Sequence, residues 1–313
     1  MVCVIGEALV DLVGQPPDPD GTVRYLAHPG GSPFNVAIGL ARLGQPARLV
    51  ARLAQDAFGR QLRAHAERNG VDLSLAVAAA EPSTLAVVSL DADRNASYDF
   101  YRTGTADWQW TPAELSRIPD DAGWVHAGSL ASWLDPGAAA IEGRLTDLTG
   151  TTVVSYDPNI RPALLGERSA AVARIERLVA LSRVVKASAE DLGWLYPDRD
   201  LHGALRHWAA LGPAVVVVTD GNRGAHAVAN GGEPVLVPSR PVAVVDTVGA
   251  GDAFMAGLID ALARSGLLAG GNTPNGEQLR RAVEQAALVA ALTVARAGAD
   301  PPTAEELAKA GEG

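Results

Sequence analysis

Short apolar runs alternate with amphipathic stretches along most of the chain. Buried strands are predicted where β-branched residues cluster, at 124–127, 152–156, 183–186 and 214–219. Between them, apolar residues recur every three or four positions, which predicts helices at 137–148, 170–181 and 201–211. Apolar strands that alternate with amphipathic helices are typical of a mainly parallel sheet covered by helices on both faces. The sequence therefore predicts a doubly wound α/β fold.

The first third of the chain keeps this alternation with one interruption. Strands are predicted at 2–13 and 48–53, and helices at 30–43 and 58–69. Two apolar runs within 84–101 instead flank the polar residues 91–95, which is the pattern of a β-hairpin. Because the hairpin breaks the βα alternation, we expect a small β-sheet lid inserted into one domain that spans 1–313. The lid segments are expected at about 16–28 and about 82–104.

Composition narrows the class of protein. The 313 residues are 48% hydrophobic and 20% charged, as in ordinary globular proteins. Acidic residues outnumber basic ones by 36 to 26, which argues against a nucleic-acid partner. The single cysteine, Cys3, allows no internal disulfide. No signal peptide and no apolar stretch of membrane-spanning length is evident, so we expect a cytoplasmic protein without membrane contact.

The strongest chemical signal lies late in the chain. An apolar run at 242–245, predicted to be a strand, leads into Asp246-Thr247-Val248-Gly249-Ala250-Gly251-Asp252-Ala253-Phe254, and a helical pattern follows. Glycines allow a tight turn, and the free N–H groups of the following helix form an anion site. A carboxylate at such a site is unfavourable unless it has a role such as accepting a proton from a hydroxyl. The alternative is a turn in which Asp252 caps the helix.

An earlier glycine pair gives a second, weaker signal. Gly30-Gly31 precedes a predicted helix that carries Asn35 in its first turns, and Asn35 can both donate and accept hydrogen bonds toward a hydroxyl-rich ligand. The alternative is a glycine turn in which Asn35 bonds the backbone. Neither a Walker-type phosphate loop nor a Gly-x-Gly-x-x-Gly after the first strand is present, which weakens a dinucleotide-binding interpretation.

The two signals together resemble the paired signatures of the ribokinase-like carbohydrate kinases, the PfkB family, across essentially the whole chain. Residues 157–164 and Lys186-Ala187-Ser188 resemble the fructokinase-like branch. The resemblance implies a ribokinase-like fold with a β-sheet lid, through which members often dimerise. It also implies transfer of the γ-phosphate of ATP to a sugar hydroxyl. Fructose is the first substrate expected, and 2-keto-3-deoxygluconate is the alternative.

Residues matching the family motifs acquire expected roles. Asp252 matches the catalytic base, and Arg161 fits a contact to the γ-phosphate. The anion hole would be formed by Gly249, Ala250, Gly251 and the N–H of Asp252. Sugar hydroxyls would be held by Asp11, Gly30, Gly31 and Asn35, and an acidic sugar could be bound by Tyr101 and Arg102. The structural alternative for Asp11 is a cap or turn former at the end of a strand.

The resemblance also implies nucleotide and cation sites. ATP would contact Lys186, Ser188, Thr219, Gly221, Gly224, Gly249 and Gly251. The family often carries Asn-x-x-Glu, tied to Mg²⁺ through water, where this chain has Ser188 and Asp191. Whether Glu190 or Asp191 orders the magnesium waters stays open, and either could cap a helix instead. A site for a monovalent cation such as K⁺ would involve Asp246, Val248, Thr293, Arg296 and Gly298.

Two other classes of function deserve comparison. A regulator that binds sugar or nucleotide without turnover would be expected to lack the base or the anion-hole glycines, and Asp252, Gly249 and Gly251 are all present. A nicotinamide-dependent dehydrogenase would need the phosphate-binding fingerprint that the first strand lacks. The six histidines show no metal-ligand spacing. The sequence therefore favours a sugar kinase, and the family resemblance implies a homodimer formed through the lid.

Overall fold

A computed structural model describes residues 1–90 and 96–311. Within these residues the main sheet has eight strands in the order β14-β13-β12-β11-β10-β9-β1-β4. In this sheet β4, β1, β9, β10, β11 and β12 run parallel to one another, and β13 and β14 close the sheet as an antiparallel hairpin. Their bounds are β1 Val2–Ile5, β4 Ala47–Val50, β9 Trp124–Gly128, β10 Val153–Asp157, β11 Val184–Ser188, β12 Val215–Thr219, β13 Ala225–Ala229 and β14 Val235–Val237.

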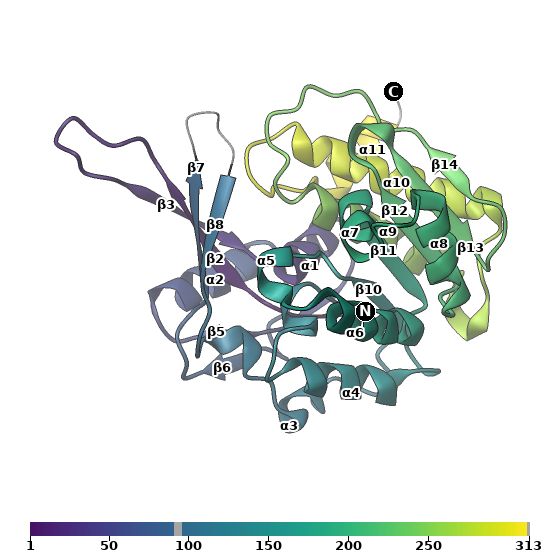
Figure 1. Ribbon diagram of the computed structural model, residues 1–313, viewed down its shortest axis with the longest axis horizontal. Helices are drawn as coiled ribbons and strands as arrows, with labels where there is room; N and C mark the ends of the chain where they lie inside the picture. The colour runs from purple at the N-terminus through teal and green to yellow at the C-terminus, as the bar shows by residue number, and fades with distance from the viewer. Residues whose placement is uncertain (91–95, 312–313) are drawn as a thin grey trace.

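Helices cover both faces of this sheet, as the alternating pattern predicts (Figure 1). One apolar core contains side chains of α1 (Ser32–Arg42), α2 (Ala57–Arg68), α9 (Ala250–Ser265) and α10 (Gly276–Val294). A second core, on the other face, contains side chains of α4 (Ala138–Leu148), α6 (Arg168–Leu181), α7 (Ala189–Leu195) and α8 (Leu201–Ala210). Short elements complete the fold: α3 Pro112–Leu115, α5 Pro162–Leu165, α11 Ala304–Gly311, β5 Arg52–Ala54 and β6 Val77–Ala79.

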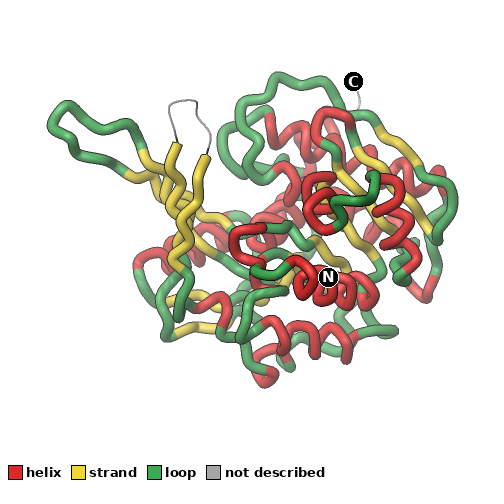
Figure 2. The backbone as a smooth tube through the Cα atoms, viewed as in Figure 1, coloured by secondary structure: helices red, strands yellow, loops and turns green. Residues whose placement is uncertain are grey.

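A separate mixed sheet of four strands forms the lid, in the order β3-β2-β7-β8. Its strands project from the body as two neighbouring hairpins, drawn in yellow in Figure 2. Their bounds are β2 Leu9–Gly14, β3 Tyr25–Gly30, β7 Leu85–Leu90 and β8 Ala96–Tyr101. The small inserted sheet is thus confirmed, whereas the predicted turn at 91–95 lies outside the described residues.

Two predicted strands differ in the structure. The run at 2–13 divides into β1 of the main sheet and β2 of the lid, because the chain turns at Gly6. Glycine is needed at this turn, since a Cβ atom there would lie 2.2 Å from Pro33 Cγ. The run at 242–245 is no strand, and Val244 and Val245 are more than 60% exposed. Among the described strands none pairs with this run, and the Val245 N–H donates instead to the carbonyl of Val294 at the end of α10.

In the part of the chain that the structure describes, none of the helices combines the length and the apolar character that crossing a bilayer requires.

Candidate active site

Asp252 lies in the first turn of α9, where α9 meets the start of α1. Its carboxylate accepts hydrogen bonds from Ser32 Oγ at 2.6 Å and from Asn35 Nδ2 at 2.8 Å. The carboxylate does not cap its own helix, whose N-cap residue is Gly249. The helix-capping alternative for Asp252 is therefore wrong, and Asn35 points at this carboxylate rather than bonding the backbone.

Burial raises the pKa of Asp252 to about 6. The hydrogen bonds from Ser32 and Asn35 and the positive charge of Lys186 oppose this rise, while the negative charge of Asp157 adds to it. A carboxylate with a pKa near 6 is ionised at neutral pH and is more basic than an exposed aspartate, which suits a general base.

Two close approaches explain the glycines of the turn before Asp252. Gly249 adopts a left-handed φ of 75°, and a Cβ atom there would lie 2.5 Å from Ala299 Cβ. A Cβ atom on Gly251 would lie 3.0 Å from Lys186 Nζ. Glycine therefore lets the ammonium group approach the start of the helix.

Backbone amides at this helix start form a candidate anion hole. Among the described residues, the N–H groups of Gly251 and Asp252 have no backbone acceptor, as expected at a helix N-terminus. Ala250 was also expected in the anion hole, but its N–H already donates to the carbonyl of Thr247 at 3.3 Å. Gly251, Asp252 and the Lys186 ammonium group together provide a site for negative charge.

A buried ion pair supports this site from the main sheet. Lys186 Nζ in β11 lies 2.8 Å from Asp157 Oδ2 at the end of β10, and both side chains are at most 5% exposed. Burial alone would lower the pKa of Lys186, but the Asp157 carboxylate raises it above its usual value. Lys186 therefore remains charged beneath Gly251. The roles of Asp157 and Ser32 were not predicted from the sequence, although Asp157 begins the run at 157–164 and Ser32 directly follows Gly31.

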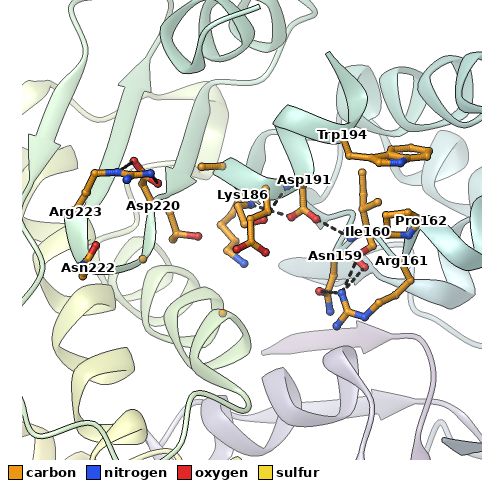
Figure 3. Close-up of a pocket in the computed structure, with 16 residues that line it drawn as sticks. Asn159, Ile160, Arg161, Pro162, Lys186, Asp191, Trp194, Asp220, Asn222 and Arg223 are labelled. Atoms are coloured by element: carbon orange, nitrogen blue, oxygen red, sulfur yellow. Dashed lines mark hydrogen bonds and ion pairs between the residues drawn. The ribbon is translucent and has the colours of Figure 1, made fainter. Parts of the chain in front are cut away.

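A cavity of about 720 Å³ opens over Lys186 and Gly251. Figure 3 shows Asp220, Asn222 and Arg223 on one side, Lys186 in the middle, and Asn159 and Arg161 on the other. Further lining residues include four that were predicted to bind nucleotide, namely Ser188, Thr219, Gly221 and Gly251. The structure therefore brings the predicted phosphate contacts together at the carboxyl edge of the parallel strands.

The two candidate magnesium residues differ in surroundings. Asp191 is buried, and its oxygens accept the N–H groups of Ile160 and Ser188 at 2.9 Å each. The Ser188 hydroxyl in turn accepts the Asp191 N–H, which completes a capping box at the start of α7. Glu190 is exposed and lines the cavity. In the described residues no cluster of three or more His, Cys, Asp or Glu side chains is arranged to hold a metal.

A second, more apolar cavity of about 500 Å³ adjoins the first and shares Thr219, Gly221, Asn222 and Gly251 with it. Gly224 also lines this second cavity. Its apolar walls are built by Pro241, Val242, Val244, Phe254, Ala287, Ala290, Ala291 and Val294. The valines at 242 and 244 thus line a pocket instead of a sheet, which the apolar pattern alone could not distinguish.

Asp11 reaches the site from the lid. A Cβ atom on Gly30 would lie 2.3 Å from Asp11 Oδ2, so glycine at that position lets the carboxylate lie against the backbone. Burial raises the pKa of Asp11 to about 6, while the positive charges of His28 and Arg161 oppose the rise and Asp252 adds to it. The charges of Asp252 and Arg161 therefore both act on the Asp11 carboxylate.

The remaining predicted sugar contacts differ in where their side chains lie; they are Gly31, Tyr101 and Arg102. Gly31 adopts a φ of 105° at the N-cap of α1, and a Cβ atom there would lie 2.6 Å from the carbonyl oxygen of Glu7. Tyr101 is 63% exposed. It pairs with Leu85, which itself pairs with Val10, the residue before Asp11. Because neighbouring residues of a strand project from opposite faces, the Tyr101 side chain lies on the lid face opposite to Asp11. Arg102 follows β8 and is half-buried.

The residues predicted for a monovalent cation are only partly assembled. Asp246 accepts the N–H groups of Val248 at 3.0 Å and Gly298 at 2.9 Å. Thr293 is buried, and its hydroxyl donates to the Val289 carbonyl within α10. Arg296 forms ion pairs with Glu306 and Asp300. Asp246, Val248 and Gly298 therefore form one cluster, whereas the side chains of Thr293 and Arg296 bond to other groups.

Comparisons with known proteins match this arrangement. The profile of the pfkB family carbohydrate kinases matches residues 1–306. A fructokinase of Rhizobium leguminosarum bv. trifolii is 38% identical over 269 residues, which cover 86% of this chain and 81% of the relative. The solved structure of fructokinase with bound ATP from Xylella fastidiosa superposes with a TM-score of 0.89 at 28% identity, and covers 99% of this chain and 98% of that one.

Another solved structure, fructokinase from Vibrio cholerae O395 in its fructose-, ADP- and calcium-bound form, has a TM-score of 0.83 at 28% identity and covers 99% of this chain and 97% of its own. Fold, site and similarity together define a ribokinase-like sugar kinase. The chain belongs to the pfkB family of carbohydrate kinases.

Proposed function

We propose that this protein transfers the γ-phosphate of ATP to a hydroxyl of fructose. The observation that carries the proposal is the half-buried Asp252 carboxylate, held by Ser32 and Asn35 beside the free N–H groups of Gly251 and Asp252. A base and an anion site at one point are what transfer to an alcohol requires. The fructokinases to which the chain is similar support the choice of fructose.

The two adjoining cavities fit the two parts of ATP. The apolar cavity around Val242, Val244 and Phe254 accommodates a purine ring. The larger cavity then receives the phosphates between Thr219 and Lys186, with the γ-phosphate above Gly251. The solved relative with bound ATP supports ATP as the nucleotide.

The sugar lies between the lid and α9 in this proposal. Asp11 accepts a hydrogen bond from one hydroxyl, and Asp252 accepts the proton of the attacking hydroxyl. The new bond joins the sugar oxygen to the γ-phosphorus, and the bond from that phosphorus to the β,γ-bridging oxygen breaks, so ADP leaves. Lys186, the Gly251 amide and Arg161 stabilise the negative charge on the transferring group.

Cations complete the site. Glu190 is the better-placed carboxylate for ordering magnesium-bound water, because both oxygens of Asp191 already accept backbone N–H groups. Mg²⁺ keeps several waters and needs only one or two carboxylates besides the phosphates, so the residues present fit it. When bound, Mg²⁺ neutralises phosphate charge. The cluster of Asp246, Val248 and Gly298 is our candidate for a K⁺ site.

The lid offers a surface for a second copy of the chain. Among the described residues, its exposed large apolar side chains are Val23, Tyr25, Leu26 and Tyr101, which are between 44% and 63% exposed. We propose that two lids pair to form a homodimer, since exposed apolar patches mark interaction surfaces. Light scattering should give the mass of a dimer, and Leu26→Asp should give that of a monomer. A wild-type protein that is monomeric at micromolar concentration would contradict the pairing.

A coupled ADP-release assay over a substrate panel tests the proposed function. Fructose is expected to give a kcat/KM at or above about 10⁴ M⁻¹s⁻¹. If 2-keto-3-deoxygluconate exceeds fructose by tenfold or more, the scaffold assignment stands and the substrate is wrong. If no sugar, sugar acid or nucleoside releases ADP, the protein is a regulator that binds these ligands without turnover.

A further inference from the structure

His28 in β3 occupies the lid position directly opposite Asp11 in β2. Directly opposed residues of an antiparallel pair project from the same face, with their Cβ atoms about 5 Å apart. The next pair along, Leu12 and Ala27, projects from the other face and packs against the apolar core beside α2. His28 and Asp11 therefore share the lid face that looks away from α2.

Charged groups of the active site act on the Asp11 carboxylate on this face of the lid. The charged groups that act on Asp11 come from three elements besides its own strand: His28 on β3, Arg161 before α5, and Asp252 on α9. His28 and Arg161 both favour the ionised carboxylate, whereas burial and Asp252 disfavour it. Asp11 is half-buried, while the imidazole of His28 is exposed and free to approach a ligand above the sheet.

We propose that His28 is a second sugar-binding residue of the lid, donating an N–H to a sugar oxygen next to the hydroxyl that Asp11 accepts. When the imidazole is protonated, its positive charge also favours the ionised form of Asp11 that accepts this hydroxyl. A vicinal pair of hydroxyls, as on a ketose or other polyol, matches a donor and an acceptor set side by side. The assignment rests on the proposed sugar-kinase function and extends it to a residue with no role in the chemistry.

Replacement of His28 distinguishes this role from a structural one. His28→Gln should weaken fructose binding by about threefold to tenfold, the usual cost of losing a hydrogen bond. Without His28 no positive charge on β3 lowers the pKa of Asp11, so this pKa should rise. The loss of fructose affinity on acidification should therefore begin at a higher pH. His28→Lys keeps a positive charge and should restore the acid limb without restoring the affinity.

Calorimetric Kd values for fructose and for ATP across pH provide the measurement, after wild-type turnover of fructose has been established. Arg24→Gln is the matched control, because Arg24 is an exposed cation of the same hairpin paired with Asp18. The control should leave both ligands unchanged, and neither His28 variant should change the Kd for ATP. Wild-type fructose affinity and pH dependence in His28→Gln, or an equal loss of ATP binding, would overturn the assignment. A wild-type protein inactive on fructose would instead overturn the proposed function, and the role of His28 with it.

Discussion

The Asp252 carboxylate is held by side chains that lie more than 200 positions away in the sequence. Ser32 and Asn35 each donate to one of its oxygens, and Lys186 adds a positive charge nearby. From sequence, the helix dipole and backbone N–H groups are expected to keep this carboxylate ionised. The structure instead assigns that task to side-chain donors, which act against burial and leave the pKa at about 6.

A dependence of kcat on pH follows from this balance. The base is active only when ionised, so kcat with fructose should be constant near about pH 8 and fall as pH drops through about 6. Ser32→Ala removes a donor that favours the ionised form, so the acid limb should move to higher pH. Steady-state rates across pH measure this, with Ser116→Ala, an exposed serine, as the control. An unmoved limb in Ser32→Ala would show that another group limits the rate.

At the scale of elements, the start of α9 depends on the conformation of one glycine. Gly249 has a left-handed φ and no room for a Cβ atom beside Ala299, whereas Gly266 at the other end of the same helix has a φ of 64° and open space. An alanine at either position would be strained by the left-handed backbone, but only an alanine at Gly249 would also clash with a neighbouring residue. They therefore form a matched pair for substitution.

Gly249→Ala should lower the free energy of unfolding by about 2–4 kcal/mol, combining backbone strain with overpacking. Gly266→Ala should cost about 1 kcal/mol from strain alone. Because Gly249 shapes the anion hole, only its variant should also weaken ATP binding. Denaturant unfolding and ATP calorimetry of both variants measure these effects, and equal losses in the two would contradict the steric argument.

Elements that could be predicted from sequence are those with a clear periodicity. The strands of the main sheet, the helix after Gly31 and the turn before Asp252 follow from local pattern, because each buries a continuous apolar run or face. The change of sheet between β1 and β2 could not be predicted, since both strands are apolar and the clash at Gly6 involves the distant Pro33. The pairing of Lys186 with Asp157 likewise depends on strand order, which local pattern does not reveal.

At the scale of the whole molecule, two buried carboxyl groups lie where the chain passes between body and lid. Glu7 and Asp107 are each 1% exposed. Asp107 Oδ1 accepts the N–H of Ala8 at 2.9 Å and so ties the exit of β8 to the entry of β2, while its Oδ2 is buried without a partner among the described residues. Burial, with a further contribution from Glu7, raises the pKa of Asp107 to about 7.

Asp107 should therefore make stability fall with rising pH. The unfolded carboxyl ionises near pH 4 and the folded one near 7, so stability is full below about pH 4 and is lost progressively up to about pH 7. Asp107→Asn removes this titration and should narrow the difference in Tm between about pH 5 and about pH 8. Asp120→Asn, at a 90% exposed side chain, is the control. An unchanged difference in Asp107→Asn would mean that Asp107 is ionised throughout this range.

The central claim is that Asp252 is the base of a sugar kinase, and Asp252→Asn tests it most directly. This variant keeps the size of the side chain and one acceptor oxygen but removes the base. Steady-state kcat with fructose should fall by about 10²–10⁴-fold, while the calorimetric Kd values for ATP and fructose stay within a few-fold of wild type. A variant that retains more than about a tenth of wild-type kcat, or one that folds but no longer binds ATP, would contradict the account.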